Sequence, residues 1–199
     1  MFEKNELPSL ERFESSVYDI PLSSLDGQEN VFAKNKGKVT MIVNVTGECA
    51  NSAQYPIIED LYKEYKDLGF EVLAVPSTDF CDDAYGAFKE SNASPQHMQD
   101  HMKELYKTDL PFSELVGIAP EPKADVEQHP FYKLIQEGKD PIQGNFEKII
   151  IGRDGKKMFR FCNSDLLDLA FNAGERKTDA KQALVNIKAA IEVLLDDKI

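Results

Sequence analysis

Two stretches of the chain are continuously apolar, and a segment with a helical pattern separates them. The stretches, residues 38–45 (KVTMIVNV) and 70–76 (FEVLAVP), are rich in β-branched residues, as expected for strands buried on both faces. Between them, apolar residues recur at the spacing of one helix face, at Tyr55, Ile58, Tyr62 and Tyr65. Gly69 follows at a position where a helix commonly ends. The pattern predicts a strand–helix–strand unit with parallel strands.

Weaker patterns on either side predict the remaining elements. Residues 16–31 contain two short strand-like pieces joined by Asp26-Gly27, a dipeptide favoured in hairpin turns. Further along, the predicted elements are helices near 96–106 and 129–136, a strand–turn–strand at 148–161 and an amphipathic helix at 184–194. This order predicts an α/β protein with a thioredoxin-like fold, in which helices flank a central mixed β-sheet and a β-hairpin lies at the N-terminus. Residues 1–15 are predicted to be an N-terminal arm, and residues 16–199 a single domain.

Composition and charge narrow the class of protein. The 199 residues are 42% hydrophobic and 29% charged, which suits one globular domain. A net charge of −12 disfavours a nucleic-acid partner, because an acidic surface repels phosphates. The apolar runs are far shorter than the ~20 residues of a membrane span, and the charged N-terminus has no apolar signal core. We therefore expect no membrane partner and a cytoplasmic location. Three cysteines, Cys49, Cys81 and Cys162, are too few for a secreted disulfide framework.

Cys49 is the candidate for chemistry, because it lies between the first buried strand and the helix that follows. Free N–H groups and the helix dipole at such a position favour the thiolate, which is the nucleophilic form of cysteine. Gly47 permits a tight turn and the close approach of a ligand. The alternative interpretation is that Cys49 is a small apolar residue that only packs there.

Four blocks of sequence resemble the glutathione peroxidase family, in order and at compatible spacing. They are VYDIPLSSLDGQEN (17–30), NVTGECA (44–50), VPSTDFC (75–81) and GNFEKIIIGRDGKKMFRF (144–161). The second is similar to the family's Asn-Val-Ala-Ser-x-Cys-Gly turn, the third to its Phe-Pro-Cys-Asn-Gln-Phe-Gly stretch, and the fourth to its Trp-Asn-Phe-x-Lys-Phe stretch. The resemblance covers roughly residues 16–162 and implies a thiol peroxidase with a thioredoxin-like fold.

The resemblance also implies roles for individual residues. Cys49 aligns with the residue that attacks the peroxide O–O bond and becomes a sulfenic acid, and Asn145 aligns with an Asn that steadies the departing oxygen. The expected substrate is hydrogen peroxide or a small organic hydroperoxide. An external thiol, of the thioredoxin type or glutathione, would complete the cycle without a cofactor or a metal ion. The compact segment 116–144 lacks the insertion of tetrameric members, so we expect a monomer or a dimer.

Two positions depart from the family's pattern. Asp79 stands where the family has Gln, and an ionised carboxylate accepts hydrogen bonds but donates none. Its charge beside Cys49 would raise the pKa of the thiol, whereas a protonated Asp79 would donate as Gln does. Gly144 stands in place of Trp, which removes an N–H donor and opens the pocket.

These departures support a second hypothesis, a divergent thioredoxin-fold protein that binds a partner or senses redox state without peroxidase activity. A general disulfide oxidoreductase is disfavoured, because the sequence has no Cys-x-x-Cys motif. The two family positions for a resolving cysteine fall on Ser77 and near Met102, and neither is a cysteine. Cys81 is a candidate resolving thiol for a disulfide with Cys49, or else a free thiol in a loop. Cys162 is interpreted as a bystander.

Two clusters have the residue types of metal sites. His97 and His101 lie four residues apart on one face of a predicted helix, but the sequence offers no obvious third ligand. Asp79, Asp82 and Asp83 offer carboxylates to a hard cation. A solvated helix face and an acidic loop are the favoured interpretations, and no metal site is predicted.

Overall fold

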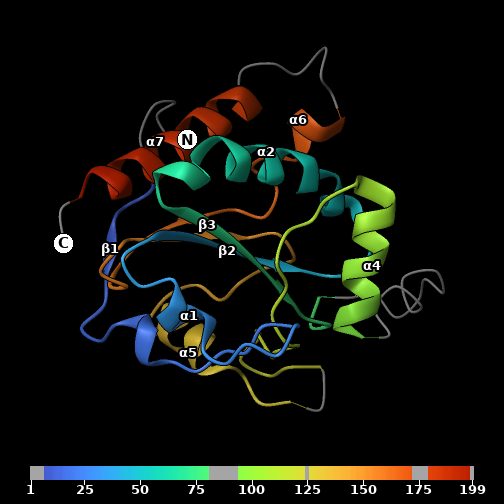
Figure 1. Ribbon diagram of the computed structural model, residues 1–199, viewed down its shortest axis with the longest axis horizontal. Helices are drawn as coiled ribbons and strands as arrows, with labels where there is room; N and C mark the ends of the chain where they lie inside the picture. Colours follow the sequence, from blue (N-terminus) through green and yellow to red (C-terminus); the bar gives the residue numbers. More distant parts are fainter. Residues whose placement is uncertain (1–6, 81–93, 124–125, 172–178, 198–199) are drawn as a thin grey trace.

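A five-stranded β-sheet forms the centre of the computed structural model, which describes residues 7–80, 94–123, 126–171 and 179–197 (Figure 1). The strands are β1 (Glu11–Arg12), β2 (Val39–Val45), β3 (Phe70–Pro76), β4 (Lys148–Ile151) and β5 (Lys157–Phe161). Their order across the sheet is β1-β5-β4-β2-β3. β2 and β3 are parallel, and β4 is antiparallel to β2 and to β5. The mixed sheet and its strand–helix–strand unit are as predicted.

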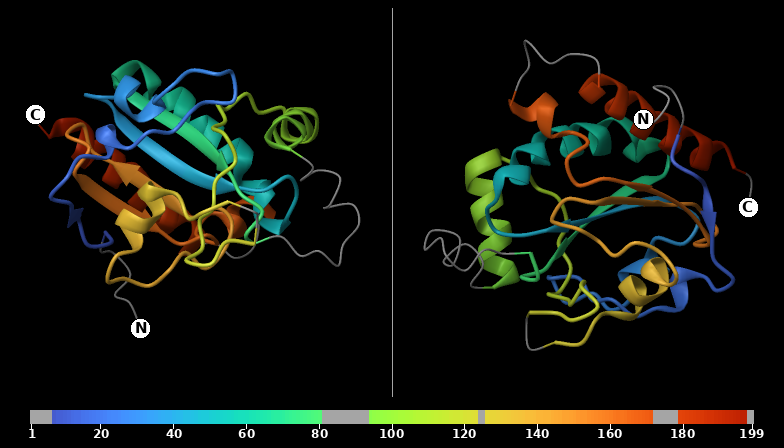
Figure 2. Two further views of the ribbon diagram at one scale, coloured as in Figure 1. Left: turned by 90° about the horizontal axis from the view of Figure 1, so that it is seen from below. Right: turned by 180° about the vertical axis from the view of Figure 1, so that it is seen from behind.

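Helices cover both faces of the sheet, which gives the molecule three layers (Figures 1 and 2). One face carries α2 (Tyr55–Tyr65) and α7 (Asp179–Asp196), and the other carries α1 (Val31–Lys34) and α5 (Pro130–Gln136). At one end of the sheet stands α4 (Pro95–Tyr106), and α6 (Leu167–Phe171) contacts the 3₁₀ helix η2 (Ala50–Gln54). Two further 3₁₀ helices are η1 (Val17–Asp19) and η3 (Lys66–Leu68). No helix within the described ranges is long and apolar enough to cross a membrane.

Side chains of the central strands alternate between two apolar clusters. Met41 and its cross-strand neighbour Ile150 pack with the residues of α2 and α7. Ile42 and Ile149 point the other way and pack with the residues of α1 and α5. All seven residues of β2 are buried, as a strand covered on both faces requires. Removing this apolar surface from water, at roughly 25 cal/mol per Å², is what holds the three layers together.

The helix of the strand–helix–strand unit ends at the predicted glycine. η3 continues α2 to Leu68, and Gly69 then adopts φ = 91°, a left-handed conformation that costs little without a Cβ. The Val39 N–H donates to the Gly69 carbonyl at 2.9 Å, so this turn leads directly into the pairing of β2 with β3.

The predicted N-terminal β-hairpin is wrong as a pair of strands. Its turn exists, because Gly27 has φ = 83° and the Ser24 N–H donates to the Gln28 carbonyl at 2.9 Å. The segments on either side form η1 and α1 instead. Ser16 caps η1 and Asn30 caps α1, each side chain accepting a nearby backbone N–H. Such local bonds between side chain and backbone compete with strand pairing.

Part of the segment predicted as an N-terminal arm joins the sheet. Glu11 and Arg12 pair antiparallel with β5 at its outer edge. The next residue, Phe13, is buried, and its N–H donates to the Lys156 carbonyl at 2.8 Å. A short polar strand therefore covers this edge, which would otherwise expose unpaired backbone groups.

Asn44 joins the end of β2 to the segment that precedes β4. Its Nδ2 donates to the Gly144 carbonyl at 3.0 Å, and its Oδ1 accepts the Glu147 N–H at 2.9 Å. Its backbone carbonyl accepts the Phe146 N–H at 2.7 Å. These bonds hold Phe146 at φ = 73°, a left-handed conformation that is rare for an aromatic residue. The fully buried Asn44 thus fixes residues 144–147 beside the loop that follows β2.

Candidate active site

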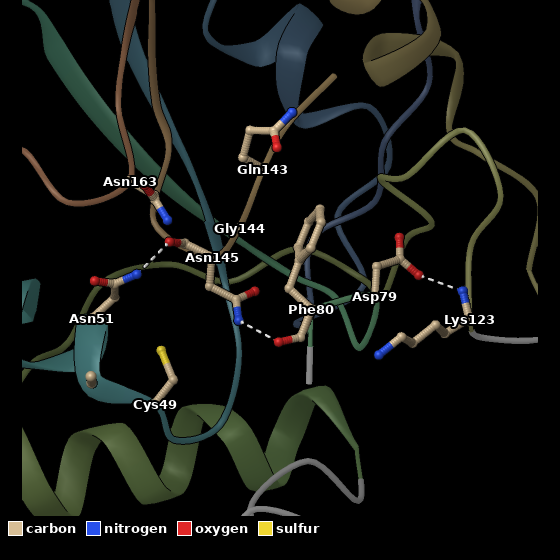
Figure 3. Close-up of a pocket in the computed structure, with 10 residues that line it drawn as sticks. Cys49, Asn51, Asp79, Phe80, Lys123, Gln143, Gly144, Asn145 and Asn163 are labelled. Atoms are coloured by element: carbon tan, nitrogen blue, oxygen red, sulfur yellow. Dashed lines mark hydrogen bonds between the residues drawn. The ribbon is translucent and has the colours of Figure 1, made fainter. Parts of the chain in front are cut away.

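A pocket of about 660 Å³ opens at one end of the sheet (Figure 3). The ends of β2, β3 and β5 and the start of β4 all lie there, because β4 runs antiparallel to its neighbours. The pocket is lined by Cys49 and the start of η2, by the residues after β3, by residues 143–145, and by Asn163 after β5. Four of the lining side chains are amides, namely Asn51, Gln143, Asn145 and Asn163. The site is therefore rich in amides, and Asp79 and Lys123 add one acidic and one basic residue to its lining.

Cys49 lies where the sequence predicts it, at the junction of strand and helix. It has extended backbone and directly precedes η2, which continues into α2. Ser52 holds the turn, since its Oγ accepts the Cys49 N–H at 3.1 Å. The same hydroxyl donates to the Cys49 Sγ at 3.7 Å. Ser52 is fully buried, so this hydrogen-bond partner of the thiol is fixed in place.

Burial raises the pKa of the Cys49 thiol above its ordinary value. The Ser52 hydroxyl and the backbone N–H groups of Asn51 and Ser52 act in the opposite direction, as the position at a helix start predicts. The negative charge of Glu48 adds to the increase. The N–H groups expected from the sequence are therefore present, but desolvation of the thiolate outweighs them.

Glu48, which precedes the cysteine, pairs with a histidine of α4. The Nε2 of His101 lies 3.2 Å from the Glu48 Oε2, and both side chains are about one-third exposed (34% and 37%). His97 makes a different contact, with its Nδ1 2.9 Å from the Ser94 Oγ. The two histidines predicted to share a helix face thus have separate partners. Among the residues that the structure describes, no group of three His, Cys, Asp or Glu side chains could hold a metal ion.

Asp79 lines the pocket, but its carboxylate is turned away from Cys49 toward the segment 118–123 (Figure 3). One oxygen accepts the N–H groups of Ile118 and Ala119 at 2.6 and 2.9 Å, and the other accepts that of Lys123 at 2.8 Å. Three backbone donors satisfy this buried carboxylate. The predicted clash of charges at the thiol is therefore not found, since Glu48 is the carboxylate that raises the pKa of Cys49.

Asn145 lies in the same pocket as Cys49, as the sequence predicts. Its Nδ2 donates to the Phe80 carbonyl at 3.3 Å, and its backbone carbonyl accepts the Asn51 Nδ2 at 3.0 Å. Its Oδ1 is buried and accepts no hydrogen bond from the described residues. Because a primary amide carries two N–H bonds, one donor of Asn145 remains available to a ligand.

Lys148 supports the pocket from beneath, and the sequence analysis overlooked it. It begins β4 and is completely buried. Its Nζ donates to the Gln54 Oε1 at 2.6 Å and to the carbonyls of Cys162 and Asn163 at 3.1 and 3.2 Å. Desolvation lowers the pKa of Lys148 to about 7, against a smaller opposing effect of Asp165. Two signals could have revealed it, namely the Lys of the Trp-Asn-Phe-x-Lys-Phe stretch, which aligns with Lys148, and a lysine at the start of an otherwise apolar strand.

Asn163 is the second residue that sequence reasoning missed. It lies over Gly144, so that a Cβ added to the glycine would be only 2.6 Å from the Asn163 Nδ2. Its carbonyl accepts the Gln54 Nε2 at 2.8 Å in addition to Lys148. No sequence motif marks Asn163, apart from its place after a strand that ends beside the pocket.

The sequence contains two further cysteines, Cys81 and Cys162. Cys81, with Asp82 and Asp83, lies outside the described residues, so the proposed Cys49–Cys81 disulfide stays a prediction. Cys162 is an exposed free thiol. Ser77 and Met102, the positions aligned with resolving cysteines, are both buried.

Comparison with known proteins identifies relatives along most of the chain. Residues 17–135, which include Cys49 and Asp79, match the family described as glutathione peroxidase. A probable phospholipid hydroperoxide glutathione peroxidase of Helianthus annuus is 33% identical over 142 residues, which are 68% of this chain and 72% of that protein. The glutathione peroxidase-like peroxiredoxin gpx1 of Schizosaccharomyces pombe is 29% identical over 149 residues, 75% of this chain and 90% of that one.

The fold agrees with these matches. The crystal structure of T. cruzi GPX1 superposes with a TM-score of 0.61 at 21% identity, covering 93% of this chain and 100% of that chain. Such a likeness shows that the three-layer arrangement is the predicted thioredoxin-like fold. Because the family match spans more than half of the chain, this protein belongs to the glutathione peroxidase family.

Proposed function

We propose that this protein is a thiol-dependent peroxidase in which Cys49 reacts with the peroxide. The observation that carries the proposal is the position of Cys49, a partly buried thiol that lines a polar pocket within the segment matching the family. Family membership supports thiol-dependent peroxidase or redox chemistry in general. The assignment of that chemistry to Cys49 is our own.

The first half of the reaction consumes the peroxide. Cys49 loses its proton to solvent, and the thiolate attacks the hydroperoxide oxygen that carries hydrogen. An S–O bond forms as the O–O bond breaks, so the sulfur is oxidised to a sulfenic acid and the peroxide is reduced. The departing oxygen leaves as hydroxide or alkoxide and takes a proton from solvent. We propose that the second N–H of Asn145 steadies this oxygen.

The second half restores the thiol. An external thiol attacks the sulfenic acid, releases water and leaves a mixed disulfide on Cys49. A second thiol then displaces Cys49 and leaves with the oxidised donor. We propose a donor of the thioredoxin type or glutathione, with Cys81 as the candidate that forms an internal disulfide instead. A cytoplasmic location, where such donors are reduced, fits this cycle.

The pocket favours small, hydrophilic substrates. Its amide side chains offer hydrogen bonds to a peroxide, and the amide of Asn163 lies over Gly144, where the family has a large Trp side chain. We therefore propose hydrogen peroxide or a small organic hydroperoxide as the substrate. This differs from the phospholipid hydroperoxide that the name of the Helianthus annuus relative specifies.

A divergent redox-sensing or binding protein is the second candidate. One observation favours it, namely that burial raises the pKa of Cys49 and so lowers the fraction of reactive thiolate. Asp79 and Gly144 add to this, because the Asp79 carboxylate accepts backbone N–H groups away from the thiol and Gly144 has no side chain that could donate.

Rapid-mixing kinetics distinguish the two candidates. Reduced protein is mixed with stoichiometric hydrogen peroxide, and the oxidised residue is identified by a sulfenic-acid trap and peptide mass spectrometry. A peroxidase shows fast oxidation confined to Cys49, which is lost in Cys49→Ser and retained in the control Cys162→Ser. Slow oxidation of all three cysteines, no faster than that of free cysteine, would contradict the proposed function. A Cys49–Cys81 disulfide among the products would identify the resolving thiol.

A further inference from the structure

Asn163 differs from the other amide side chains of the pocket in its hydrogen bonds. Asn51, Gln143 and Asn145 each donate one N–H to a backbone carbonyl, at 3.0, 3.0 and 3.3 Å respectively. The Asn163 Nδ2 donates to no group in the part of the chain that the structure describes, while the backbone carbonyl of Asn163 is bonded twice. Both of its N–H bonds are therefore available to a ligand.

The Asn163 side chain also lines the pocket that contains the Cys49 thiol. Figure 3 shows the Asn163 amide on one side of the Asn51–Asn145 hydrogen bond and the Cys49 sulfur on the other, and all four residues line the same pocket. The amide comes close because Gly144 has no side chain, since a Cβ there would lie 2.6 Å from the Asn163 Nδ2. Cβ atoms do not approach a heavy atom to within 3.0 Å, so glycine is what permits this position of the amide.

The backbone of Asn163 is held by buried groups. Lys148 and Gln54, both fully buried, donate to its carbonyl at 3.2 and 2.8 Å. Lys148 also donates to the preceding carbonyl, that of Cys162, at 3.1 Å. A side chain on such an anchored backbone needs to order only its own two torsions to bind a ligand, which favours catalysis by positioned dipoles.

We propose that Asn163 is a catalytic residue that donates a hydrogen bond to the departing oxygen of the peroxide, positioned over Gly144 by Lys148 and Gln54. This inference rests on the proposed function, because it assigns a donor to the step in which Cys49 breaks the O–O bond. As that bond breaks, negative charge develops on the departing oxygen, and a fixed N–H donor stabilises the charge before a solvent proton neutralises it.

A double-mutant cycle with Gly144 tests the inference. Asn163→Ala removes the donor, whereas Gly144→Ala leaves Asn163 in the sequence and pushes its amide aside. Gly144 is not in the left-handed region, and the displaced atom ends a flexible side chain, so the fold should tolerate the alanine. Each variant should lower the second-order rate constant with hydrogen peroxide about tenfold, less than the ~100-fold of an enclosed oxyanion site, because this pocket is open to water.

The effects of the two substitutions on the rate constant with hydrogen peroxide should not be additive. Since both act on one hydrogen bond, the double variant should be about as slow as either single variant, whereas independent effects would multiply to about a hundredfold. Asn186→Ala, which removes an amide of α7, is the matched control and should leave the rate unchanged. Thermal unfolding of every variant verifies that it is folded.

Alkylation by iodoacetamide provides the second readout, because it requires the Cys49 thiolate but no departing oxygen. In both variants the alkylation rate should stay within about twofold of wild type, whereas the reaction with peroxide should be slower. Equal loss in both reactions, or an unchanged peroxide rate in Asn163→Ala, overturns the inference while leaving Cys49 as the reactive residue. A wild-type protein that reacts no faster than free cysteine overturns the proposed function and this inference together.

Discussion

The Nζ of Lys148 lies 2.6 Å from the Oε1 of Gln54, in a buried contact between β4 and η2. A protonated lysine can only donate, so Gln54 must turn its oxygen toward it. The Nε2 of Gln54 then faces the Asn163 carbonyl and the Oδ1 of Asn51, which leaves the Asn51 Nδ2 directed at the Asn145 carbonyl. In its protonated form, Lys148 thereby sets the direction of a chain of amides that ends in the pocket.

The pH dependence of stability should reveal Lys148. Burial lowers its pKa to about 7, whereas the unfolded chain has the ordinary value of about 10.4. Between these values the unfolded chain binds more protons than the folded one, so the free energy of unfolding contributed by this group rises with pH. Urea unfolding of wild type and Lys148→Met is measured from about pH 6 to about pH 9.5. Above about pH 7, the free energy of unfolding of wild type should increase relative to that of the variant. Methionine keeps the apolar stem and removes the titration, so a constant difference between the two would contradict the prediction.

Asp79 should matter to stability and not to the thiol. Asp79→Ala leaves the N–H groups of Ile118, Ala119 and Lys123 without their acceptor, at a cost of about 2–3 kcal/mol in the free energy of unfolding. Asp79→Asn keeps one acceptor oxygen, so its free energy of unfolding should decrease less than that of Asp79→Ala. Chemical denaturation measures both, and iodoacetamide measures the reactivity of Cys49 at one pH. A large change in reactivity without loss of stability would show that the carboxylate acts on the thiol after all.

The reaction of Cys49 should accelerate well into the alkaline range. Burial raises the pKa of this thiol above the ordinary value of 9.0, and only the thiolate attacks. The rate constant for alkylation should therefore keep increasing beyond about pH 9, and the peroxide rate should follow it while the fold persists. A plateau already reached near neutral pH would contradict the effect of burial.

Two substitutions next to Cys49 should change its reactivity in opposite directions. Ser52→Ala removes the hydroxyl that donates to the sulfur, which raises the pKa of the thiol further, while Glu48→Gln removes a negative charge that raises it. At a fixed neutral pH we expect alkylation about two- to tenfold slower in the first variant and about two- to fivefold faster in the second. Ser52→Thr keeps the hydroxyl and serves as the control for the first. Changes of the same sign in both variants would point to altered access rather than altered charge.

The parts of the fold that local pattern determines were predictable from the sequence. Residues 39–45 alternate between two apolar clusters, and Gly69 ends the helix of the first strand–helix–strand unit, as predicted. The β-hairpin that the pattern predicted around Gly27 is wrong, although the turn itself is present. Its flanking residues have strand-like composition, but Ser16 and Asn30 cap helical turns instead.

The candidate site was predictable only as far as Cys49, the proposed nucleophile, and one amide. Cys49 and Asn145 do line one pocket, and their motifs are local. The direction of Asp79 depends on backbone donors about 40 residues away, in the segment 118–123. Lys148 lies in the stretch aligned with Trp-Asn-Phe-x-Lys-Phe, but local pattern does not show that Lys148 and Asn163 contact Gln54, across separations of 94 and 109 residues. Roles that depend on such long-range hydrogen bonds emerge only from the three-dimensional structure.

The Asn44 contact has a consequence for folding as well as for geometry. Asn44 bonds to Gly144, Phe146 and Glu147, about 100 residues further along the chain, so the pocket walls are assembled from early and late sequence together. A nascent or truncated chain that ends before these residues would carry Cys49 without its opposite wall. Its thiol would then behave as an ordinary, solvent-accessible cysteine. If Cys49 is oxidised selectively as we propose, the selectivity should therefore appear only once residues 144–147 are in place, which makes it a chemical marker of the native state.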